Sequence, residues 1–275
     1  MENTILVSTG ALIGRPNGRD YRLLKELTKK IRSDGFEFMM YSTWYGQEDH
    51  IVDFLKSNRI NTPTMHCQKS IGESISKGSA LDTKDAFEKF EINAKMASEI
   101  GAKKMVMHLW DGITSDAYFD NNIKAYPRLK EIADGYGVDL LIENVVCNVK
   151  DPLSHWMELL EIYPDIGFIF DTKMARFHDQ LDLLYDEKYE ILWKEHHIRH
   201  YHINDYGGGY KDWENLRTLP VGRGHIDFDR FFAFVKSAGY KGTFTFESTA
   251  LNKEGFVDTD MLNLEIDTVK GYLED

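Results

Sequence analysis

The sequence lacks the features that mark secreted and membrane proteins. It has two cysteines in 275 residues, Cys67 and Cys147, and they do not form a CxxC pair. Two such residues cannot build a disulfide framework, so a reducing compartment is expected. No stretch approaches the roughly 20 apolar residues that a membrane-spanning helix needs. The first residues carry neither a basic segment nor a long apolar one, so no secretion signal is expected there. We therefore expect a cytoplasmic protein with no membrane partner.

Positive charge and linker sequences are also scarce. The chain has 33 Lys and Arg against 45 Asp and Glu, which gives a formal net charge of -12. This surplus of negative charge repels polyphosphate, so nucleic acid is not expected as a partner. No Pro-rich or Gly/Ser-rich linker divides the chain, and a single domain over residues 1–275 is expected. The sequence leaves open whether that domain forms a homo-oligomer.

The chain does contain a regular alternation of short β-like segments and amphipathic helices. Eight strands are expected at residues 5–9, 35–41, 64–66, 104–108, 138–143, 166–171, 198–204 and 243–247. Helical spacing of apolar residues is clearest at 21–31, 87–97, 228–235 and 262–273. Helix-capping glycines are expected before the next strand at Gly35, Gly101, Gly137 and Gly239. No GxGxxG follows the first strand, so an α/β fold of the closed (β/α)8 TIM barrel type is predicted over an open dinucleotide-binding sheet.

Six consecutive predicted strands end on a side chain that can bind a metal ion or transfer a proton. These residues are His66, His108, Glu143, Asp171, His202 and Glu247. TIM-barrel active sites lie at the C-terminal ends of the strands, so these side chains are expected to meet at one mouth of the barrel.

The alternation of side chains along a strand supports this interpretation. If Asp171 points into the barrel, Phe168 and Phe170 point outward to the helices. If Glu247 points inward, Phe246 likewise packs outward. A carboxylate at an enclosed barrel mouth needs a cationic partner, and a metal ion is the simplest one.

Five short motifs together resemble the xylose isomerase-like superfamily of sugar isomerases and epimerases, which also contains endonuclease IV. They are Leu-Ile-Glu-Asn at 141–144, Phe-Asp-Thr at 170–172, His-Tyr-His-Ile-Asn-Asp at 200–205, Gly-Arg-Gly-His-Ile-Asp at 222–227 and Phe-Glu at 246–247. The resemblance covers nearly the whole chain. It implies one divalent metal ion bound by Glu143, Asp171, His202 and Glu247. Such an oxygen-dominated set suits Mn²⁺, Mg²⁺ or Co²⁺ and tolerates Zn²⁺.

The same resemblance implies catalytic roles for Glu143 and Glu247. Family members that epimerise sugars use two metal-bound glutamates, one to remove a proton and the other to return it. A metal ion that polarises a carbonyl and its neighbouring hydroxyl acidifies the C–H bond between them and stabilises the enediolate. His66 and His108 match family positions that contact substrate oxygens, or a second metal in the nuclease branch, and we assign them to the substrate.

Three further residues have alternative interpretations. Lys173 and Arg217 are candidates to hold a substrate hydroxyl or phosphate, although exposed loop cations are common. His200 shares the parity of His202 but lies one layer lower, so a hydrogen-bonded interior histidine is expected there rather than a ligand.

One departure from the family argues against a nuclease. The nuclease and several ketose epimerases carry a His three residues after the metal-binding Asp, where this chain has Met174 and its nearest His is His178. The leading hypothesis is therefore a metal-dependent isomerase or epimerase of a small sugar or sugar phosphate. The alternatives are an inosose dehydratase-like lyase, an endonuclease IV-like hydrolase and a non-catalytic sugar-binding barrel.

Overall fold

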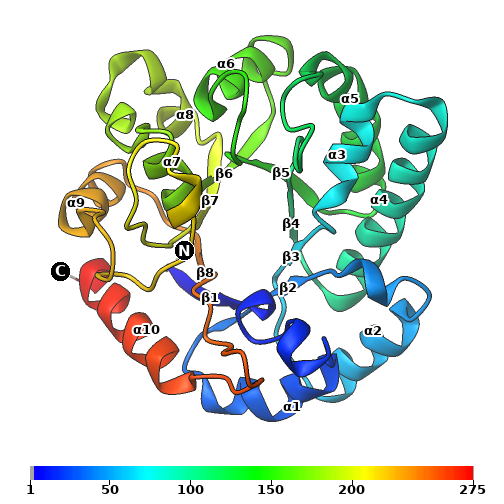
Figure 1. The fold of residues 1–275 in the computed structure, drawn as a ribbon, viewed down its shortest axis with the longest axis vertical. Coiled ribbons are helices and arrows are strands. Elements are labelled where there is room, and N and C mark those ends of the chain that lie inside the picture. Colours follow the sequence, from blue (N-terminus) through cyan, green and yellow to red (C-terminus); the bar gives the residue numbers. More distant parts are fainter. Residues whose placement is uncertain (1–2, 275) are drawn as a thin grey trace.

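The computed structural model describes residues 3–274, which form a closed barrel ringed by helices (Figure 1). The parallel strands follow one another around the barrel in chain order, and β8 pairs with β1. They are β1 (Thr4–Ser8), β2 (Gly35–Met39), β3 (Thr64–His66), β4 (Lys104–Met107), β5 (Asp139–Glu143), β6 (Gly167–Asp171), β7 (Ile198–His202) and β8 (Thr243–Phe246). The predicted TIM barrel is confirmed, with small differences at the strand ends.

Helices cover the outside of the barrel. The α-helices are α1 (Leu24–Leu27), α2 (Glu48–Ser57), α3 (Ser70–Lys77), α4 (Ala80–Ile100), α5 (Phe119–Gly135), α6 (Pro152–Ile162), α7 (Thr172–Phe177), α8 (Ile191–Lys194), α9 (Phe228–Ser237) and α10 (Thr259–Glu274). Short 3₁₀ helices are η1 (Thr9–Ala11), η2 (Arg15–Asn17), η3 (Tyr21–Leu23), η4 (Thr28–Lys30), η5 (Ser42–Trp44), η6 (Leu181–Tyr185), η7 (Glu187–Tyr189) and η8 (Trp213–Asn215). Within residues 3–274, no helix combines the length and the apolar character needed to cross a membrane.

The main core lies between the outer face of the strands and the helices. Phe168 of β6 stacks on Trp156 of α6 with ring centroids 4.4 Å apart. Phe170 of the same strand packs against Phe231 of α9 at 6.5 Å. Both phenylalanines are fully buried, as the alternation of side chains predicted, and each contributes on the order of 2 kcal/mol to the free energy of unfolding.

The barrel interior is more polar than this outer layer. A small apolar cluster, separate from the main core, consists of Val106, Leu141 and Ile169. Beside it, Thr245 Oγ1 lies 2.8 Å from His200 Nε2, and Thr243 Oγ1 lies 2.5 Å from His200 Nδ1. The prediction of a hydrogen-bonded interior histidine at position 200 is therefore confirmed.

Three of the four predicted capping glycines are confirmed and one is wrong. Gly101, Gly137 and Gly239 have φ values of 85°, 70° and 67°, which glycine adopts without steric cost. Gly35, however, is the first residue of β2. A Cβ atom there would lie 2.8 Å from Asn61 Nδ2, so close packing explains this glycine.

The single helix predicted over residues 21–31 is also wrong. The segment divides into η3, α1 and η4, so that α-helix spans only Leu24–Leu27. Asn263 of α10 accepts a hydrogen bond from Arg32 N at 2.8 Å and donates one to Lys30 O at 2.9 Å. These contacts with a distant helix use backbone groups at the end of the segment, which sequence periodicity alone does not reveal.

Candidate metal centre and substrate cavity

The four predicted metal ligands meet at the C-terminal mouth of the barrel. One ligand atom from each of Glu143, Asp171, His202 and Glu247 lies within 4.8 Å of the other three. The first three are the last residues of β5, β6 and β7, and Glu247 directly follows β8. Parallel pairing places Asp171 beside His202 across the β6–β7 register. The spacing allows all four side chains to share one ion.

Two asparagines from the family motifs hold these carboxylates in position. Asn204 Nδ2 donates to Asp171 Oδ2 at 2.8 Å and to Glu247 Oε2 at 3.3 Å. Asn144 Oδ1 accepts the backbone N–H of Asp171 at 2.6 Å, and Asn144 Nδ2 donates to the Asp171 carbonyl at 3.0 Å. The two amide side chains thus link the ends of β5, β6, β7 and β8 into one layer.

Met174, which stands where the nuclease and several ketose epimerases carry a His, lies in the first turn of a helix that is capped by Asp171. Asp171 Oδ1 accepts the backbone N–H of Met174 at 2.7 Å and so caps the start of α7. His178 is buried elsewhere, where its Nε2 accepts the backbone N–H of Cys147 at 3.1 Å. Neither residue therefore adds an imidazole ligand to the cluster of Asp171.

Repulsion among the buried carboxylates makes the cluster suitable for a cation. Burial raises the pKa of Asp171, and although Lys173 lowers it, the charges of Glu143 and Glu247 add to the rise. Burial also opposes ionisation of Glu247, but the positive charges of His202, Lys69 and Lys173 together outweigh it and lower the pKa of Glu247 to about 2. A divalent ion would relieve this repulsion and allow all three carboxylates to ionise. The donor set therefore fits a hard divalent metal.

A buried oxygen of Glu143 lacks a well-formed hydrogen bond. Its Oε2 atom lies 2.9 Å from His108 Nε2 and 3.4 Å from His66 Nε2, but none of the three atoms has hydrogen-bond geometry. The opposite ring nitrogens are occupied, since His108 Nδ1 meets Asp111 Oδ2 at 2.9 Å and His66 Nδ1 meets the Cys67 carbonyl at 2.7 Å. His66, His108 and Glu143 thus form a second group of potential ligands that shares Glu143 with the first.

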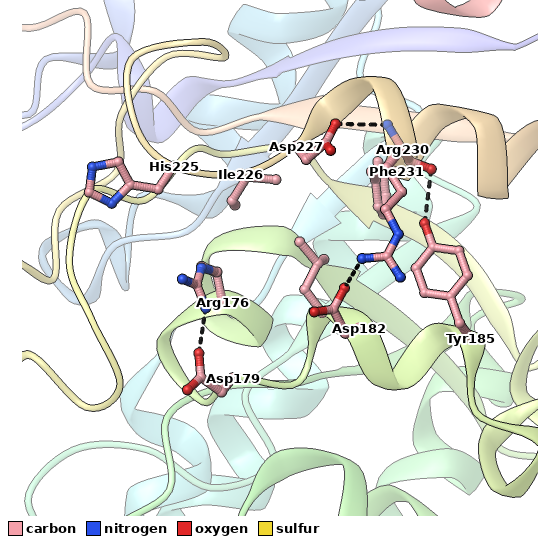
Figure 2. Close-up of a pocket in the computed structure, with 10 residues that line it drawn as sticks. Arg176, Asp179, Asp182, Tyr185, His225, Ile226, Asp227, Arg230 and Phe231 are labelled. Atoms are coloured by element: carbon pink, nitrogen blue, oxygen red, sulfur yellow. Dashed lines mark hydrogen bonds and ion pairs between the residues drawn. The ribbon is translucent and has the colours of Figure 1, made fainter.

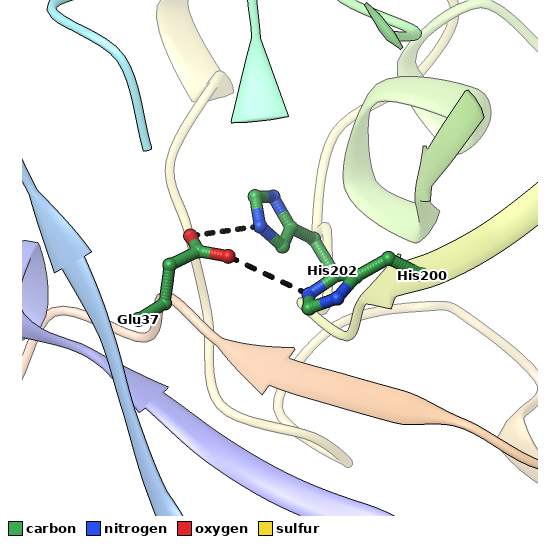
Figure 3. A group of neighbouring side chains, drawn as sticks. All are labelled: Glu37, His200 and His202. Carbon is green, nitrogen blue, oxygen red and sulfur yellow. Dashed lines mark hydrogen bonds and ion pairs between the residues drawn. The ribbon is translucent and has the colours of Figure 1, made fainter. Parts of the chain in front are cut away.

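Sequence reasoning missed Glu37, a fully buried carboxylate inside the barrel. Its Oε1 atom lies 3.0 Å from His202 Nε2, and its Oε2 atom lies 3.5 Å from His200 Nε2 (Figure 3). When a metal ion binds, a proton kept on His202 Nε2 and shared with Glu37 would leave the lone pair of Nδ1, which lies 3.2 Å from Glu143 and 3.5 Å from Glu247, free for the ion. That is the tautomer a metal-binding histidine needs.

The signal for Glu37 was present in the sequence. The residue stands between Phe36 and Phe38, whose rings pack in the main core outside the barrel. The alternation rule that oriented Asp171 therefore also turns Glu37 inward. A rule limited to the last residue of each strand does not select Glu37, because Glu37 lies in the middle of β2.

A cavity of about 390 Å³ opens beside the cluster and is lined by Glu247 and Lys173. Lys173 Nζ donates to Thr218 Oγ1, which also lines the cavity, at 3.0 Å. Arg217 is exposed and is not among the lining residues, so the structure does not bring this predicted substrate contact to the site. Two cations that the sequence did not indicate, Arg19 and Lys69, line the cavity instead.

A second cavity, of about 510 Å³, lies between α7, η6 and α9 (Figure 2). Its two arginines are already paired, since Arg176 bonds to Asp179 and Arg230 bonds to Asp182. The Arg230 guanidinium also stacks over the Tyr185 ring at 4.2 Å. None of the predicted site residues lines this cavity, so we assign it no chemical role.

Asp116, Cys147 and His155 form a further buried group of potential ligands. The carboxylate of Asp116 already accepts the backbone N–H groups of residues 148–150 at 2.7–2.9 Å and meets His155 Nε2 at 2.9 Å. These contacts use both oxygens of Asp116. The group therefore fastens the loop after β5 to the loop before α5 and resembles a structural anchor rather than a metal site.

Fold and cluster together define a TIM-barrel protein with a candidate metal centre at its C-terminal mouth. Residues 26–263 match the family described as xylose isomerase-like TIM barrel, and the chain belongs to that family.

One sequence relative and two solved structures are among the proteins that resemble this chain. The uncharacterized protein MJ1311 of Methanocaldococcus jannaschii is 28% identical over 186 residues, which cover 65% of this chain and 59% of that protein. This chain therefore matches less than two thirds of that relative. A D-tagatose 3-epimerase-like protein superposes with a TM-score of 0.70 at 20% identity, covering 98% of this chain and 97% of the other. D-allulose 3-epimerase from Methylomonas sp., in complex with D-allulose, gives a TM-score of 0.72 at 15% identity over 98% and 97%.

Proposed function

We propose that the protein is a divalent-metal-dependent isomerase or epimerase of a small sugar or sugar phosphate. The observation that carries the proposal is the convergence of Glu143, Asp171, His202 and Glu247 on one point beside a cavity. The family membership and the sugar epimerases among the fold relatives support a sugar as the substrate.

The metal ligands would be the carboxylate oxygens of Glu143, Asp171 and Glu247 and the Nδ1 atom of His202. This set suits Mn²⁺, Mg²⁺ or Co²⁺ and tolerates Zn²⁺. When bound, the ion would supply positive charge to stabilise negative charge that develops on neighbouring substrate oxygens.

Glu143 and Glu247 would carry the proton transfer. One carboxylate takes the proton from the carbon beside the substrate carbonyl, and the C–H electron pair moves into the new C=C bond of an enediolate. The other carboxylate, once protonated by water, gives that proton to carbon, which uses the C=C electron pair and restores the carbonyl, and the first carboxyl group releases its proton to water. The two residues come from the ends of β5 and β8, separated by β6 and β7, and both approach His202 Nδ1. They therefore reach the same point from different strands.

Three predicted residues would bind the substrate around this point. His66 and His108 turn their Nε2 atoms toward Glu143, where they could donate hydrogen bonds to substrate oxygens next to that carboxylate. Lys173 lines the cavity and is nearly fully buried, so its ammonium group has few partners other than Thr218 and a ligand.

Elemental analysis of the purified protein tests the metal site. We expect about one divalent ion per wild-type chain and little in Asp171→Ala, because a missing carboxylate removes a ligand and the affinity with it. Asp182→Ala is the matched control, since Asp182 is an exposed carboxylate of the second cavity. Equal metal content in Asp171→Ala and wild type would refute the site. Two ions per chain would reassign His66 and His108 as ligands.

Product analysis by NMR in deuterated water tests the reaction. Isomerisation or epimerisation incorporates solvent deuterium at the reacting carbon without loss of water, and Glu247→Gln should lower the rate by about 10²–10⁴-fold. Loss of water from the product would identify a lyase of the inosose dehydratase type. Cleavage of an abasic DNA duplex would identify a hydrolase, and inactivity toward a broad sugar panel despite bound metal would favour a sugar-binding barrel.

A further inference from the structure

Three cationic side chains gather in the cavity of a protein with a net charge of -12. They are Arg19, Lys69 and Lys173, and the carboxylate that lines the same cavity is Glu247. Within residues 3–274, no carboxylate oxygen lies within 4.0 Å of any of the three cationic groups. The cavity wall is therefore locally positive, against the overall sign of the protein.

Lys69 and Lys173 have partners at a distance in the metal cluster. Both lie within electrostatic reach of Glu247, and Lys173 also acts on Asp171. Their charges can therefore be explained by the carboxylates of the proposed metal site. Arg19 needs another explanation.

Arg19 lies against the Tyr41 ring in the cavity lining. Its guanidinium carbon lies 4.8 Å from the centroid of the Tyr41 ring, and the Tyr41 hydroxyl donates to the Ile13 carbonyl at 2.6 Å. The Arg19 carbonyl accepts the indole N–H of Trp44 at 3.0 Å, which fixes a backbone with φ of 51°. The Arg19 Nε atom is buried and has no hydrogen-bond partner.

A stacked guanidinium with free N–H donors is suited to a planar or tetrahedral anion. Arginine binds carboxylates and phosphates through two parallel hydrogen bonds, and stacking on an aromatic ring leaves those donors available. The fixed backbone and the anchored tyrosine reduce the entropy lost when a ligand binds. Hydroxyls of Ser42 and Thr249 line the same cavity and can complete the hydrogen bonding of an anionic group.

We propose that Arg19 is a specificity-determining residue that binds an anionic end group of the substrate, so the substrate is a sugar bearing a phosphate or a carboxylate. This inference rests on the proposed function, because it takes the cavity beside the metal cluster as the substrate site. The shared chemistry is a small anion on a polyhydroxylated chain, and the choice between phosphate and carboxylate is left to the experiment.

Calorimetric titration of three size-matched compounds into the Mn²⁺-loaded protein tests the proposal. The compounds are sn-glycerol 3-phosphate, D-glycerate and glycerol, which differ in whether they carry a phosphate, a carboxylate or neither. We expect one of the anions to bind at least about tenfold more tightly than glycerol, and Arg19→Gln to reduce that preference by about 10–100-fold. Whichever anion is preferred in the wild type identifies the end group.

Two further variants separate a specific contact from general electrostatics. Arg15→Gln removes the same charge from an exposed residue of the same segment that does not line the cavity, and it should keep the preference. Arg19→Lys keeps the charge but lacks the planar guanidinium that forms two parallel hydrogen bonds, so it should keep part of the preference for the anion. Equal binding of all three compounds by the wild type, or equal losses in Arg19→Gln and Arg15→Gln, would overturn the proposal. Metal content and deuterium incorporation report on the proposed function independently of Arg19.

Discussion

The two faces of the barrel strands have different chemical characters. On β6, Phe168 and Phe170 point outward and pack against aromatic rings of α6 and α9. On the same strand, Asp171 lies in the candidate metal cluster. On β7, Tyr201 packs outward against Phe231 with centroids 5.7 Å apart, whereas His200 and His202 point inward to Glu37. Side chains one residue apart therefore belong to an apolar core and to a polar interior.

The outer face of the strands mainly stabilises the fold, whereas the inner face carries the side chains that are suited to binding an ion. Burial of aromatic rings on the outer face contributes stability that does not depend on any partner ion. Buried charges on the inner face cost free energy unless each is paired, and Glu37 with His202 is one such pair. Removing an outer ring should therefore mainly affect unfolding, and removing an inner charge should mainly affect binding.

The largest expected effect is on the outer face. Phe170→Ala should lower the free energy of unfolding by about 3–5 kcal/mol, because it leaves a cavity beside Phe231 in a fully buried region. Urea denaturation measures this change. Folded Phe170→Ala protein should still bind about one divalent ion per chain. If folded Phe170→Ala protein lost the ion, as is expected for Asp171→Ala, the outer face would also determine ion binding, and the comparison of the two faces would be wrong.

A buried carboxylate in the helix layer offers a pH-dependent test of the same comparison. Glu265 of α10 accepts hydrogen bonds from Ser248 Oγ at 2.7 Å and from the backbone N–H of Val221 at 2.9 Å. Burial raises the pKa of Glu265 from 4.5 to about 7 even though these hydrogen bonds lower it. The folded state therefore binds the proton more tightly than the unfolded state does.

This difference in pKa makes the free energy of unfolding fall as the pH rises. The stabilisation is fully present below about pH 4.5, and it is lost as the pH rises through about 7, where Glu265 must ionise in the folded protein. The loss is about 3 kcal/mol. Glu265→Gln should lack this contribution, so unfolding free energies of wild type and variant, measured at pH 5 and pH 8, should differ in slope. Parallel pH profiles would contradict the assignment.

Local patterns in the sequence were sufficient to predict the barrel and the residues that stand at the ends of its strands. The inward direction of Asp171 follows from the rings of Phe168 and Phe170, which precede it and point outward, and parallel pairing then brings strand ends together without further information. Glu37 could have been found by the same rule. These features depend on residues that are adjacent in sequence.

The remaining features depend on contacts between distant segments. Arg19 reaches the cavity because Tyr41 and Trp44, which follow β2, hold the loop after β1. The predicted helix near Leu24 is interrupted where Asn263 binds its end. Neither contact has a signature in the sequence of either segment.

The smallest effect expected, and the most specific to the inner face, concerns Glu37. Glu37→Gln keeps the size of the side chain but removes the charge that faces His202 Nε2 at 3.0 Å, so the tautomer with Nδ1 free for a metal ion becomes less favoured. Divalent-ion affinity, measured by competition with a chelating dye, should fall by about 10–100-fold while the folded structure persists. Thr245→Val is the matched control, because it removes a hydroxyl 3.5 Å from Glu37 Oε2 in the same layer without changing charge. A charge that orients His202 must affect ion binding more than a neighbouring hydroxyl does. Unchanged affinity in Glu37→Gln, or an equal loss of affinity in Thr245→Val, would therefore show that Glu37 only fills the barrel interior.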